Sequence, residues 1–463
     1  MTHTDLAIDT RLTLDVGNAA AGGEAVARVD GRVVFVSGAL PGERVTVRVT
    51  EVRKALARAE VVDVHEPSPH RVDDRRIALG AAGVGGMEYA HVDLPHSREL
   101  KEAAAADQFR RIGGLDLTPR VLPAAHEAPA TAADPTAGLD WRTRVQLAVD
   151  AEGTVGMHAT GSHRVVPVEL VPFAVPEIEM LGLHHLSLPG ADRLEIAVAA
   201  DRAGEYASGA VIVDGTPEAE SRTTLRHAVE AAGPGWHLLV REPDPSRRPR
   251  RGARRGQSAR GGRNRGGAGA RTVLRPVLGD GLLTEHVAGI DTPFRVRADG
   301  FWQVHRDAAR ELSARVVEET TGARRVLDLY CGVGLFSLAV SGAHGVSVTG
   351  IEGSDAAIES AEVNAEAAGV LADFTTARIE KLESLPEADT VVLDPPRAGA
   401  GAAVTRLLAD SAAERIVYVS CDGATFARDA AALVGSGFRL EKTAAHDYFP
   451  LTAHTEFLSV FTR

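Results

Sequence analysis

The stretch Asp328-Leu329-Tyr330-Cys331-Gly332-Val333-Gly334 decides the fold class of the C-terminal third of this chain. It follows an apolar segment and precedes one rich in Ala and Leu, so it is predicted to join a strand to a helix. Glycines at such a turn let backbone amides and the helix N-terminus lie close to a nucleotide-like ligand. Glu352 ends the next predicted strand, where a carboxylate suits ribose hydroxyls. The dinucleotide fingerprint needs a third glycine where Ser337 stands, which favours a compact adenosyl ligand bound near Gly332, Gly334 and Glu352.

Further strand patterns extend this unit into an α/β domain. Segments with strand character alternate with helical stretches rich in Ala, Leu and Glu, which is typical of a doubly wound parallel sheet. The predicted strands are Arg325 to Tyr330, Ser347 to Glu352, Ala372 to Thr376, Thr390 to Asp394 and Arg415 to Ser420. Glu456 to Phe461 is predicted to be an edge strand that closes the sheet.

The length and composition fit a multidomain globular protein. With 463 residues and about 150 residues per domain, the chain is expected to hold about three domains. Residues 8–66 alternate apolar and polar positions between Gly and Pro turns, which predicts a small β-barrel. Residues 70–290 form a predicted central mixed α+β domain with one helix over 91–112, and residues 291–463 carry the doubly wound sheet.

The cysteine content and the lack of long apolar runs narrow the class of protein. Two cysteines supply neither a four-thiolate metal or iron–sulfur site nor a disulfide framework, so no metal is expected. No apolar run approaches about 18 residues, and the N-terminus lacks a basic region followed by an apolar stretch. We therefore predict a cytoplasmic protein without a membrane partner.

Positive charge is concentrated in one segment, although the net charge of the chain is −12. Residues 246–271 contain ten arginines and no acidic residue. Their low-complexity Arg/Gly/Ser composition predicts a disordered insertion over 243–271 in the central domain. Two interpretations stay open: a solvated linker made basic by codon bias, and an RNA-tethering arm that contacts phosphates without sequence choice.

Cys421 stands directly after the last predicted parallel strand, in Ser420-Cys421-Asp422-Gly423. A thiolate is a strong nucleophile, and the N-terminus of the helix predicted over 424–433 favours the thiolate. A buried structural cysteine is the alternative. We interpret Cys421 as a nucleophile for covalent catalysis and Cys331, inside the Gly-rich turn, as a packing residue.

Three other groups of residues are candidates for the site. Asp394-Pro395-Pro396-Arg397 follows a strand where open α/β sheets place their ligand crevices, although a simple strand break would look the same. His454 and Glu456 lie near the C-terminus; Glu456 is a candidate general base if burial raises its pKa, and surface positions are the alternative. Phe301 and Trp302 are candidates to stack on a base or on adenine, with packing in the core as the alternative.

Taken in order, these elements resemble the RNA uracil-5-methyltransferases that use S-adenosylmethionine. The resemblance rests on Gly300-Phe301-Trp302-Gln303, Asp328 to Phe336, Asp394 to Arg397, Ser420-Cys421 and His454-Thr455-Glu456. The N-terminal segment Gly31 to Glu43 resembles the RNA-binding TRAM domain that these enzymes often carry. Residues 85–114 and 141–167 resemble their central domain.

The resemblance implies a class I methyltransferase domain, S-adenosylmethionine as the cofactor, and transfer RNA or 23S ribosomal RNA as the partner. We expect a monomer. By the resemblance, the cofactor and reaction site would be lined by Gln303, Tyr330, Gly332, Gly334, Glu352 and Asp394. Cys421 would be the nucleophile and Glu456 the base, with Phe301 and Arg397 as substrate contacts.

Two positions depart from the family pattern. Many relatives bind an iron–sulfur cluster partly through a Cys-Gly-Gly-Cys unit, whereas this chain reads Val84-Gly85-Gly86-Met87, so no cluster is expected. Asp422 replaces the usual asparagine after the nucleophile and, unless paired, raises the pKa of the thiol. Two other functions stay open: an RNA-binding or RNA-folding protein that has lost turnover, and a methyltransferase acting on an amino group. The latter would need an aromatic residue where Arg397 stands.

Overall fold

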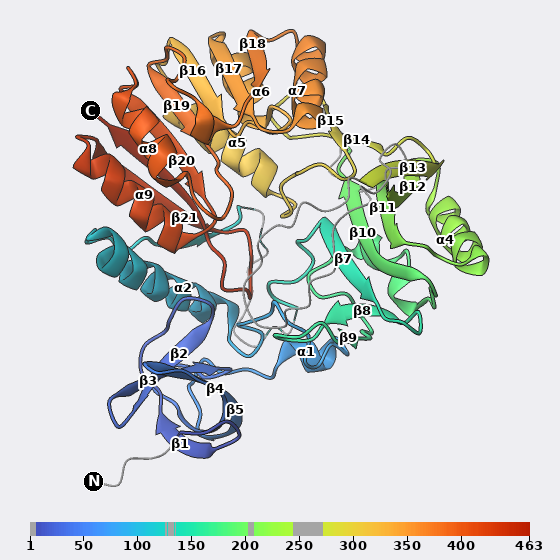
Figure 1. The fold of residues 1–463 in the computed structure, drawn as a ribbon, viewed down its shortest axis with the longest axis vertical. Coiled ribbons are helices and arrows are strands. Elements are labelled where there is room, and N and C mark those ends of the chain that lie inside the picture. Colours follow the sequence, from blue (N-terminus) through green and yellow to red (C-terminus); the bar gives the residue numbers. More distant parts are fainter. Residues whose placement is uncertain (1–5, 126, 128–133, 135, 202–207, 244–271) are drawn as a thin grey trace, which may run out of the picture.

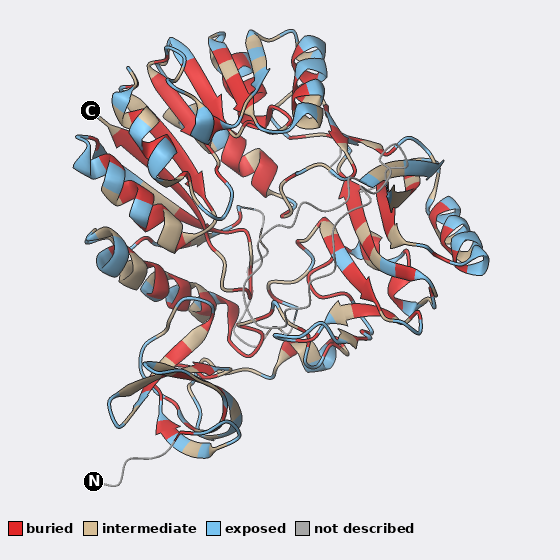
Figure 2. Cartoon of the chain, viewed as in Figure 1, coloured by how far each residue is buried: buried red, intermediate tan, exposed pale blue. Residues whose placement is uncertain are grey.

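The structure of the chain, a computed structural model, describes residues 6–125, 127, 134, 136–201, 208–243 and 272–463. Figure 1 shows an N-terminal barrel, a central sheet, and a C-terminal sheet flanked by helices. In Figure 2 the strands of the two large sheets are mostly buried, and the outer sides of their helices are exposed. No helix in the described ranges combines the length and the apolar character that spanning a bilayer requires.

Five strands form the N-terminal barrel in the order β1-β4-β5-β3-β2. They are β1 (Arg11–Asp15), β2 (Glu24–Val29), β3 (Arg32–Ser37), β4 (Arg44–Val52) and β5 (Leu56–Glu66). Every second residue of β2, β3 and β4 is buried. Successive side chains of a strand point to opposite faces of the sheet, so every second one faces the core. The predicted small barrel is confirmed. Buried Glu43 accepts a hydrogen bond from Arg71 (Nε to Oε1, 2.6 Å), which joins the barrel to the next segment.

A long helix, α2 (Leu94–Gln108), follows the barrel. It begins three residues after the predicted start at residue 91, because the Asp93 carboxylate caps it by accepting from His96 N (2.8 Å). The helix continues as one π turn, Phe109–Gly113, and ends at left-handed Gly114. α2 packs between the barrel region and α9 (Gly423–Gly435) of the C-terminal sheet (Figure 1).

The segment that replaces the cysteine pattern is part of the apolar core. Val84 and Met87 are fully buried and belong to the same cluster as Trp141 and Phe173 of the central part. Apolar packing therefore orders this segment. Within the described residues, no group of three or more His, Cys, Asp or Glu side chains is arranged to hold a metal ion.

A seven-stranded sheet forms the central part in the order β13-β12-β11-β10-β7-β8-β9. The strands are β7 (Arg144–Val149), β8 (Val155–His158), β9 (Val165–Val166), β10 (Ala191–Ala199), β11 (Ser208–Gly215), β12 (Trp236–Pro243) and β13 (Thr272–Leu278). The helices of this part are α1 (Arg75–Ala78), α3 (Pro176–Glu179) and α4 (Ala219–Ala232).

The Arg/Gly segment interrupts this central sheet. β12 pairs antiparallel with β13, and Pro243 lies opposite Thr272. The chain between them therefore leaves and re-enters the sheet at adjacent strand ends, as expected for an insertion. Residues 244–271 of the predicted disordered insertion 243–271 lie outside the described residues.

An eight-stranded sheet forms the C-terminal part in the order β18-β17-β16-β19-β20-β22-β21-β6. Its strands are β6 (Val121–Pro123), β16 (Arg325–Leu329), β17 (Ser347–Glu352), β18 (Ala372–Thr376), β19 (Thr390–Leu393), β20 (Arg415–Ser420), β21 (Arg439–Asp447) and β22 (Glu456–Thr462). Its helices are α5 (Ala308–Glu319), α6 (Leu335–His344), α7 (Asp355–Ala368), α8 (Gly401–Asp410) and α9 (Gly423–Gly435). The strands from β18 to β20 pair in parallel, which confirms the predicted doubly wound sheet. A hairpin of β14 (Leu282–Glu285) and β15 (Phe294–Arg297) precedes it.

The prediction that Glu456 to Phe461 forms an edge strand is wrong. β22 lies inside the sheet, antiparallel to β20 on one side and to β21 on the other. The sheet then continues to β6, which comes from a distant part of the sequence and pairs in parallel with β21. Local pattern alone did not place these two strands, because their pairing depends on long-range packing. Glu456 therefore begins an inner strand and is buried.

A buried ion pair and a hydrogen bond join α2 to the end of β21 and to the loop that leads into β22. Lys101 Nζ pairs with the Asp447 carboxylate and donates to Phe449 O (2.9 Å). Arg98 Nε donates to the other oxygen of Asp447 (2.9 Å). Burial raises the pKa of Asp447, but Lys101 and Arg98 outweigh it and hold this pKa below its usual value. The ion pair therefore fixes the loop against α2.

Replacing Lys101 with Ala should destabilise the protein, because Asp447 would keep a buried charge with one partner fewer. Breaking a buried ion pair from one side costs about 3–5 kcal/mol, so we expect a clear fall in melting temperature, measured by calorimetry. Lys442→Ala is the matched control, since Lys442 pairs with Glu319 while half-exposed, and exposed pairs contribute little. Equal shifts for both variants would contradict the role given to the buried pair.

Candidate active site

One cleft of about 800 Å³ opens where β16, β17, β19 and β20 end. Doubly wound sheets bind ligands at this edge, and the volume lies within the range of small-molecule sites. Nine of the predicted site residues line it: Phe301, Gln303, Tyr330, Gly332, Glu352, Asp394, Arg397, Cys421 and Glu456. Two predicted site residues, Gly334 and Trp302, do not line the cleft.

The Gly-rich turn presents open backbone to the cleft. Tyr330 follows β16 with a φ of 63°, and its N–H donates to Ile351 O (2.8 Å). An added Cβ at Gly332, where φ is 55°, would meet no atom within 4 Å. Gly334 starts α6 with a φ of 89°, and an added Cβ there would lie 2.9 Å from Leu338 Cδ1. Gly332 thus suits the close approach of a ligand, whereas Gly334 is required by the helix start.

A buried hydrogen bond supports this turn. Ser337 Oγ, on the first turn of α6, donates to Asp328 Oδ2 (2.6 Å). Burial raises the pKa of Asp328 to about 7, and the hydrogen bond from Ser337 opposes the rise. The serine that departs from the dinucleotide fingerprint therefore binds a buried acid, a role that sequence analysis missed.

Three acidic groups meet in the cleft at the ends of adjacent strands: Asp394 after β19, Cys421 after β20, and Glu456 at the start of β22. Burial, Glu456 and Asp394 raise the pKa of Cys421 to about 12, against the lowering effect of Arg397. Burial and Asp394 raise the pKa of Glu456 well above its usual value. A raised pKa is the condition on which Glu456 was predicted to be a general base. Burial also raises the pKa of Asp394 to about 7, although a hydrogen bond with Gln303 opposes this. The cleft therefore resists holding several negative charges at once.

The expectation that the N-terminus of α9 favours a Cys421 thiolate stays a prediction. Burial and the two neighbouring carboxyl groups act in the opposite direction, because they raise the pKa of the thiol. Asp422 is paired, since it caps α9 by accepting from Thr425 N (2.8 Å) and Thr425 Oγ1 (3.0 Å). It also contributes least among the groups that shift the Cys421 pKa. Asp422, which departs from the family pattern, therefore acts mainly as the cap of α9.

The two predicted stacking aromatics have different environments. Phe301 is exposed at the cleft (71%), whereas Trp302 is buried against Phe294, with 5.4 Å between ring centroids. The interpretation of Trp302 as a stacking residue is wrong, because the segment turns this ring into the core. His454 lines the cleft, and burial and Arg397 lower its pKa to about 4, so its imidazole is neutral at pH 7.

Sequence analysis missed several residues that line the cleft, among them Trp141 and Arg142 from the central part. Arg142 lies over the Trp141 ring (5.8 Å from Cζ to the centroid), and its Nε donates to Arg144 O (2.8 Å). Arg144 Nη1 in turn donates to Gly300 O (2.7 Å), next to Phe301. A Trp-Arg pair before β7 was the only local signal, and nothing local placed it beside the C-terminal sheet.

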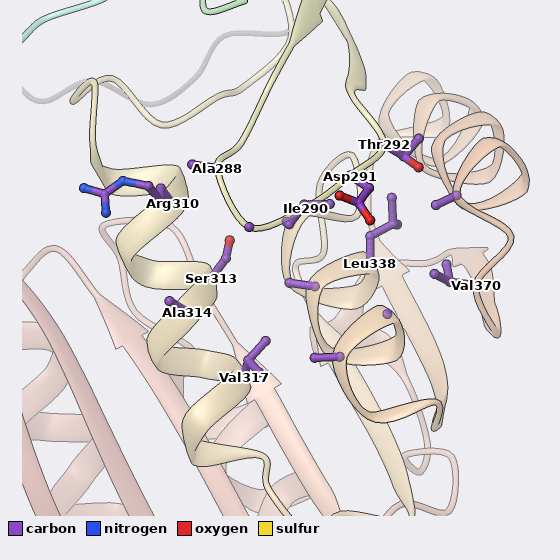
Figure 3. A pocket seen from close by; sticks show the side chains of 15 residues that line it. Ala288, Ile290, Asp291, Thr292, Arg310, Ser313, Ala314, Val317, Leu338 and Val370 are labelled. Carbon is purple, nitrogen blue, oxygen red and sulfur yellow. The ribbon is translucent and has the colours of Figure 1, made fainter. Parts of the chain in front are cut away.

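A second hollow, of about 520 Å³, lies between α5, α6 and the loop over 288–292 (Figure 3). Small and apolar side chains such as Ala314 and Leu338 make up most of its lining, with Arg310 and Asp291 at its border. It shares no lining residue with the cleft, and its lining contains no cysteine, histidine or glutamate.

The raised pKa of Cys421 gives a direct test. With a pKa of about 12, the thiolate fraction grows about tenfold per pH unit from neutral pH upward. We expect the rate of Cys421 alkylation by iodoacetamide, followed by mass spectrometry, to rise in the same proportion. Cys331 is buried, as predicted for a packing residue, so Cys421→Ala serves as the blank. A rate that levels off near neutral pH would contradict this environment.

Three family models match the chain: the TRAM domain at residues 10–62, the methyltransferase small domain at 293–417, and the tRNA (uracil-5-)-methyltransferase at 373–463. The fold is similar to the crystal structure of Pyrococcus abyssi tRNA (uracil-54, C5)-methyltransferase in complex with S-adenosyl-L-homocysteine. That likeness has a TM-score of 0.67 at 22% identity, and it covers 97% of this chain and 99% of that chain.

Curated relatives match over nearly the whole length. An uncharacterized RNA methyltransferase of Corynebacterium efficiens is 35% identical over 99% of this chain and 96% of its own. The 23S rRNA (uracil(1939)-C(5))-methyltransferase of Chromohalobacter salexigens is also 35% identical, over 97% of this chain and 89% of its own. The chain therefore belongs to the family of S-adenosylmethionine-dependent RNA (uracil-5-)-methyltransferases that carry a TRAM domain.

Proposed function

We propose that this enzyme transfers a methyl group from S-adenosylmethionine to carbon 5 of one specific uridine in transfer or ribosomal RNA, through a covalent bond between Cys421 and carbon 6. The observation that carries the proposal is the convergence of Cys421, Glu456 and Arg397 on the cleft that the Gly-rich turn borders. A thiol, a carboxyl group and a cation around one cavity are the groups that this reaction needs.

The covalent step follows from the chemistry of uracil, because carbon 5 is a weak nucleophile on its own. Attack of Cys421 Sγ on carbon 6 forms a carbon–sulfur bond and moves the electron pair of the C5–C6 double bond into an enolate. Carbon 5 then takes the methyl group, and the electron pair of the broken bond stays on the donor sulfur. Glu456 removes the proton from carbon 5, the double bond forms again, and Cys421 leaves as a thiolate.

The cofactor supplies an electrophilic methyl group on a positively charged sulfur. Gly332 fits such a ligand because its backbone borders open space, and Tyr330 lies beside it. Glu352, at the end of β17, suits ribose hydroxyls, and its Oε1 already accepts from Ser354 N (2.9 Å). Gln303 and Asp394 lie at the junction with the reacting groups.

The raised pKa values set a condition for catalysis. Cys421 must lose its proton to attack, and Glu456 must be ionised to act as a base. Arg397 lowers the pKa of both groups, and any further positive charge bound in the cleft would act in the same direction. Activation of the thiol is therefore expected on assembly of the complex.

RNA recognition is proposed to use all three parts of the chain. A target uridine must be flipped out of its stack at a cost of a few kcal/mol, and exposed Phe301 offers a stacking surface. Arg142 and Arg397 supply positive charge at the cleft. The TRAM barrel is proposed to bind RNA outside the cleft, and the role of the Arg/Gly segment stays open between linker and tether. The domain limits 8–66, 70–290 and 291–463, the monomeric state and the cytoplasmic location stay predictions.

Two observations weigh against the other functions. Arg397 stands where an amino-group methyltransferase would need an aromatic ring. Asp422 caps α9 instead of displacing the nucleophile from the cleft, so the change at Asp422 does not by itself argue for lost turnover.

The covalent step is testable with RNA that contains 5-fluorouridine. Because fluorine at carbon 5 blocks proton removal, the enzyme with S-adenosylmethionine should form an RNA–protein adduct that survives denaturation on a gel. The adduct should be absent for Cys421→Ala. An RNA-binding protein without turnover would give no adduct. An amino-group methyltransferase would still transfer labelled methyl groups to RNA when it carries the Cys421→Ala substitution.

The proposed role of Glu456 predicts that its substitution blocks a later step than the substitution of Cys421 does. Glu456→Gln should still attack and methylate ordinary uridine but release product very slowly, so methylated RNA should stay bound to Cys421. Product release in a single-turnover experiment should fall by at least about 100-fold, the size typical of general acid–base catalysis. Unchanged release, or loss of adduct formation as in Cys421→Ala, would remove Glu456 from this role.

A further inference from the structure

The loop that carries Arg397 lies on the first turns of α9, the helix that follows Cys421. Thr425 Oγ1 donates to Arg397 O (3.1 Å), and Arg428 Nη2 donates to Ala398 O (2.9 Å). One helix therefore contacts the loop directly and begins two residues after the nucleophile.

Asp429, also on α9, is the centre of this contact. Its Oδ2 accepts from Ala400 N (2.8 Å), Tyr418 OH (2.9 Å) and Gly401 N (3.3 Å), and its Oδ1 accepts from Arg428 Nε (2.9 Å). The carboxylate is buried. A buried charge with four donors holds the loop and the start of α8 in a single position, because losing any of them leaves the carboxylate less satisfied.

The loop backbone is shaped to receive this carboxylate. Gly399 has a φ of 74°, and an added Cβ there would lie 2.5 Å from Asp429 Oδ2 and 2.6 Å from Arg428 Nη2. A larger residue at 399 would therefore displace the loop from α9.

We propose that Asp429 is a positioning residue that fixes the guanidinium of Arg397 against Cys421 through the loop over 396–401. This inference rests on the proposed function only for its consequence in catalysis. The groups that face the thiol are Glu456, Asp394, Asp422 and Arg397, and Arg397 is the only one of the four that favours the thiolate. A loop that moves away from α9 removes this one favourable charge.

Alkylation of Cys421 tests the inference without RNA. Asp429→Asn keeps the size of the side chain but loses its charge and turns an amide N–H₂ toward the donors. We expect its alkylation rate by iodoacetamide at a fixed pH near 8 to fall about tenfold, as expected when an opposite charge leaves a titrating group. Arg397→Ala should give the same fall, and the double variant should fall no further.

Two further variants complete the design. Gly399→Ala, which displaces the loop and leaves Asp429 in place, should lower the rate in the same way, and it carries the test if Asp429→Asn does not fold. Asp389→Asn is the matched control, because the Asp389 carboxylate also accepts from backbone N–H groups, those of Arg324 and Arg325. It lies where β16 and β19 begin, whereas the cleft lies where these strands end. Its alkylation rate should equal that of the unchanged enzyme.

Methylation kinetics give the second measurement: kcat should fall with the alkylation rate, while the KM for S-adenosylmethionine stays the same. The inference is overturned if folded Asp429→Asn and Gly399→Ala alkylate like the unchanged enzyme, or if the effects of Asp429→Asn and Arg397→Ala multiply. The alkylation rates could behave as expected although neither the unchanged enzyme nor any variant forms the 5-fluorouridine adduct. In that case the proposed function fails and the positioning role stands.

Discussion

The interaction on which this site depends is the electrostatic coupling of Cys421, Asp394 and Glu456 around Arg397. Burial raises the pKa of each of these three acidic groups, so the cleft disfavours charge on all three at once. Arg397 opposes the rise for Cys421 and Glu456. The cleft thus disfavours the charged forms of the Cys421 thiol and the Glu456 carboxyl group, and added positive charge would favour them.

The fold produces this coupling through strand order. β19, β20 and β22 are neighbours in the sheet, so groups at residues 394, 421 and 456 meet although they are distant in sequence. Two buried carboxylates then hold the connecting segments: Asp447 ties the end of β21, where the loop to β22 begins, to α2, and Asp429 ties the loop after β19 to α9. Both loops carry cleft residues, and in both cases a buried carboxylate with several donors adds to the apolar packing. Hydrogen bonds to a carboxylate specify direction better than apolar contacts do.

The cleft is also a junction between parts of the chain. Trp141 and Arg142 come from the central part, and Arg144 holds the segment that presents Phe301. The apolar packing of Val84 and Met87 joins the same core. The cleft that contains Cys421 is therefore lined by the central part as well as by the doubly wound sheet.

The sequence by itself determined the local elements: the barrel from its alternating pattern, the strand–turn–helix unit from its glycines, and the candidates Cys421, Asp394 and Arg397 from their places at strand ends. Glu456 was a candidate from its place near the C-terminus and from the family resemblance. Such signals depend on neighbours along the chain, so they can be recognised without a structure. Only the tertiary structure decided that β22 is an inner strand, that Trp302 is buried, that Trp141 and Arg142 border the cleft, and that the Cys421 thiol is disfavoured as a thiolate. Each of these depends on contacts between segments far apart in sequence, because burial and charge–charge distances are properties of packing and not of local pattern.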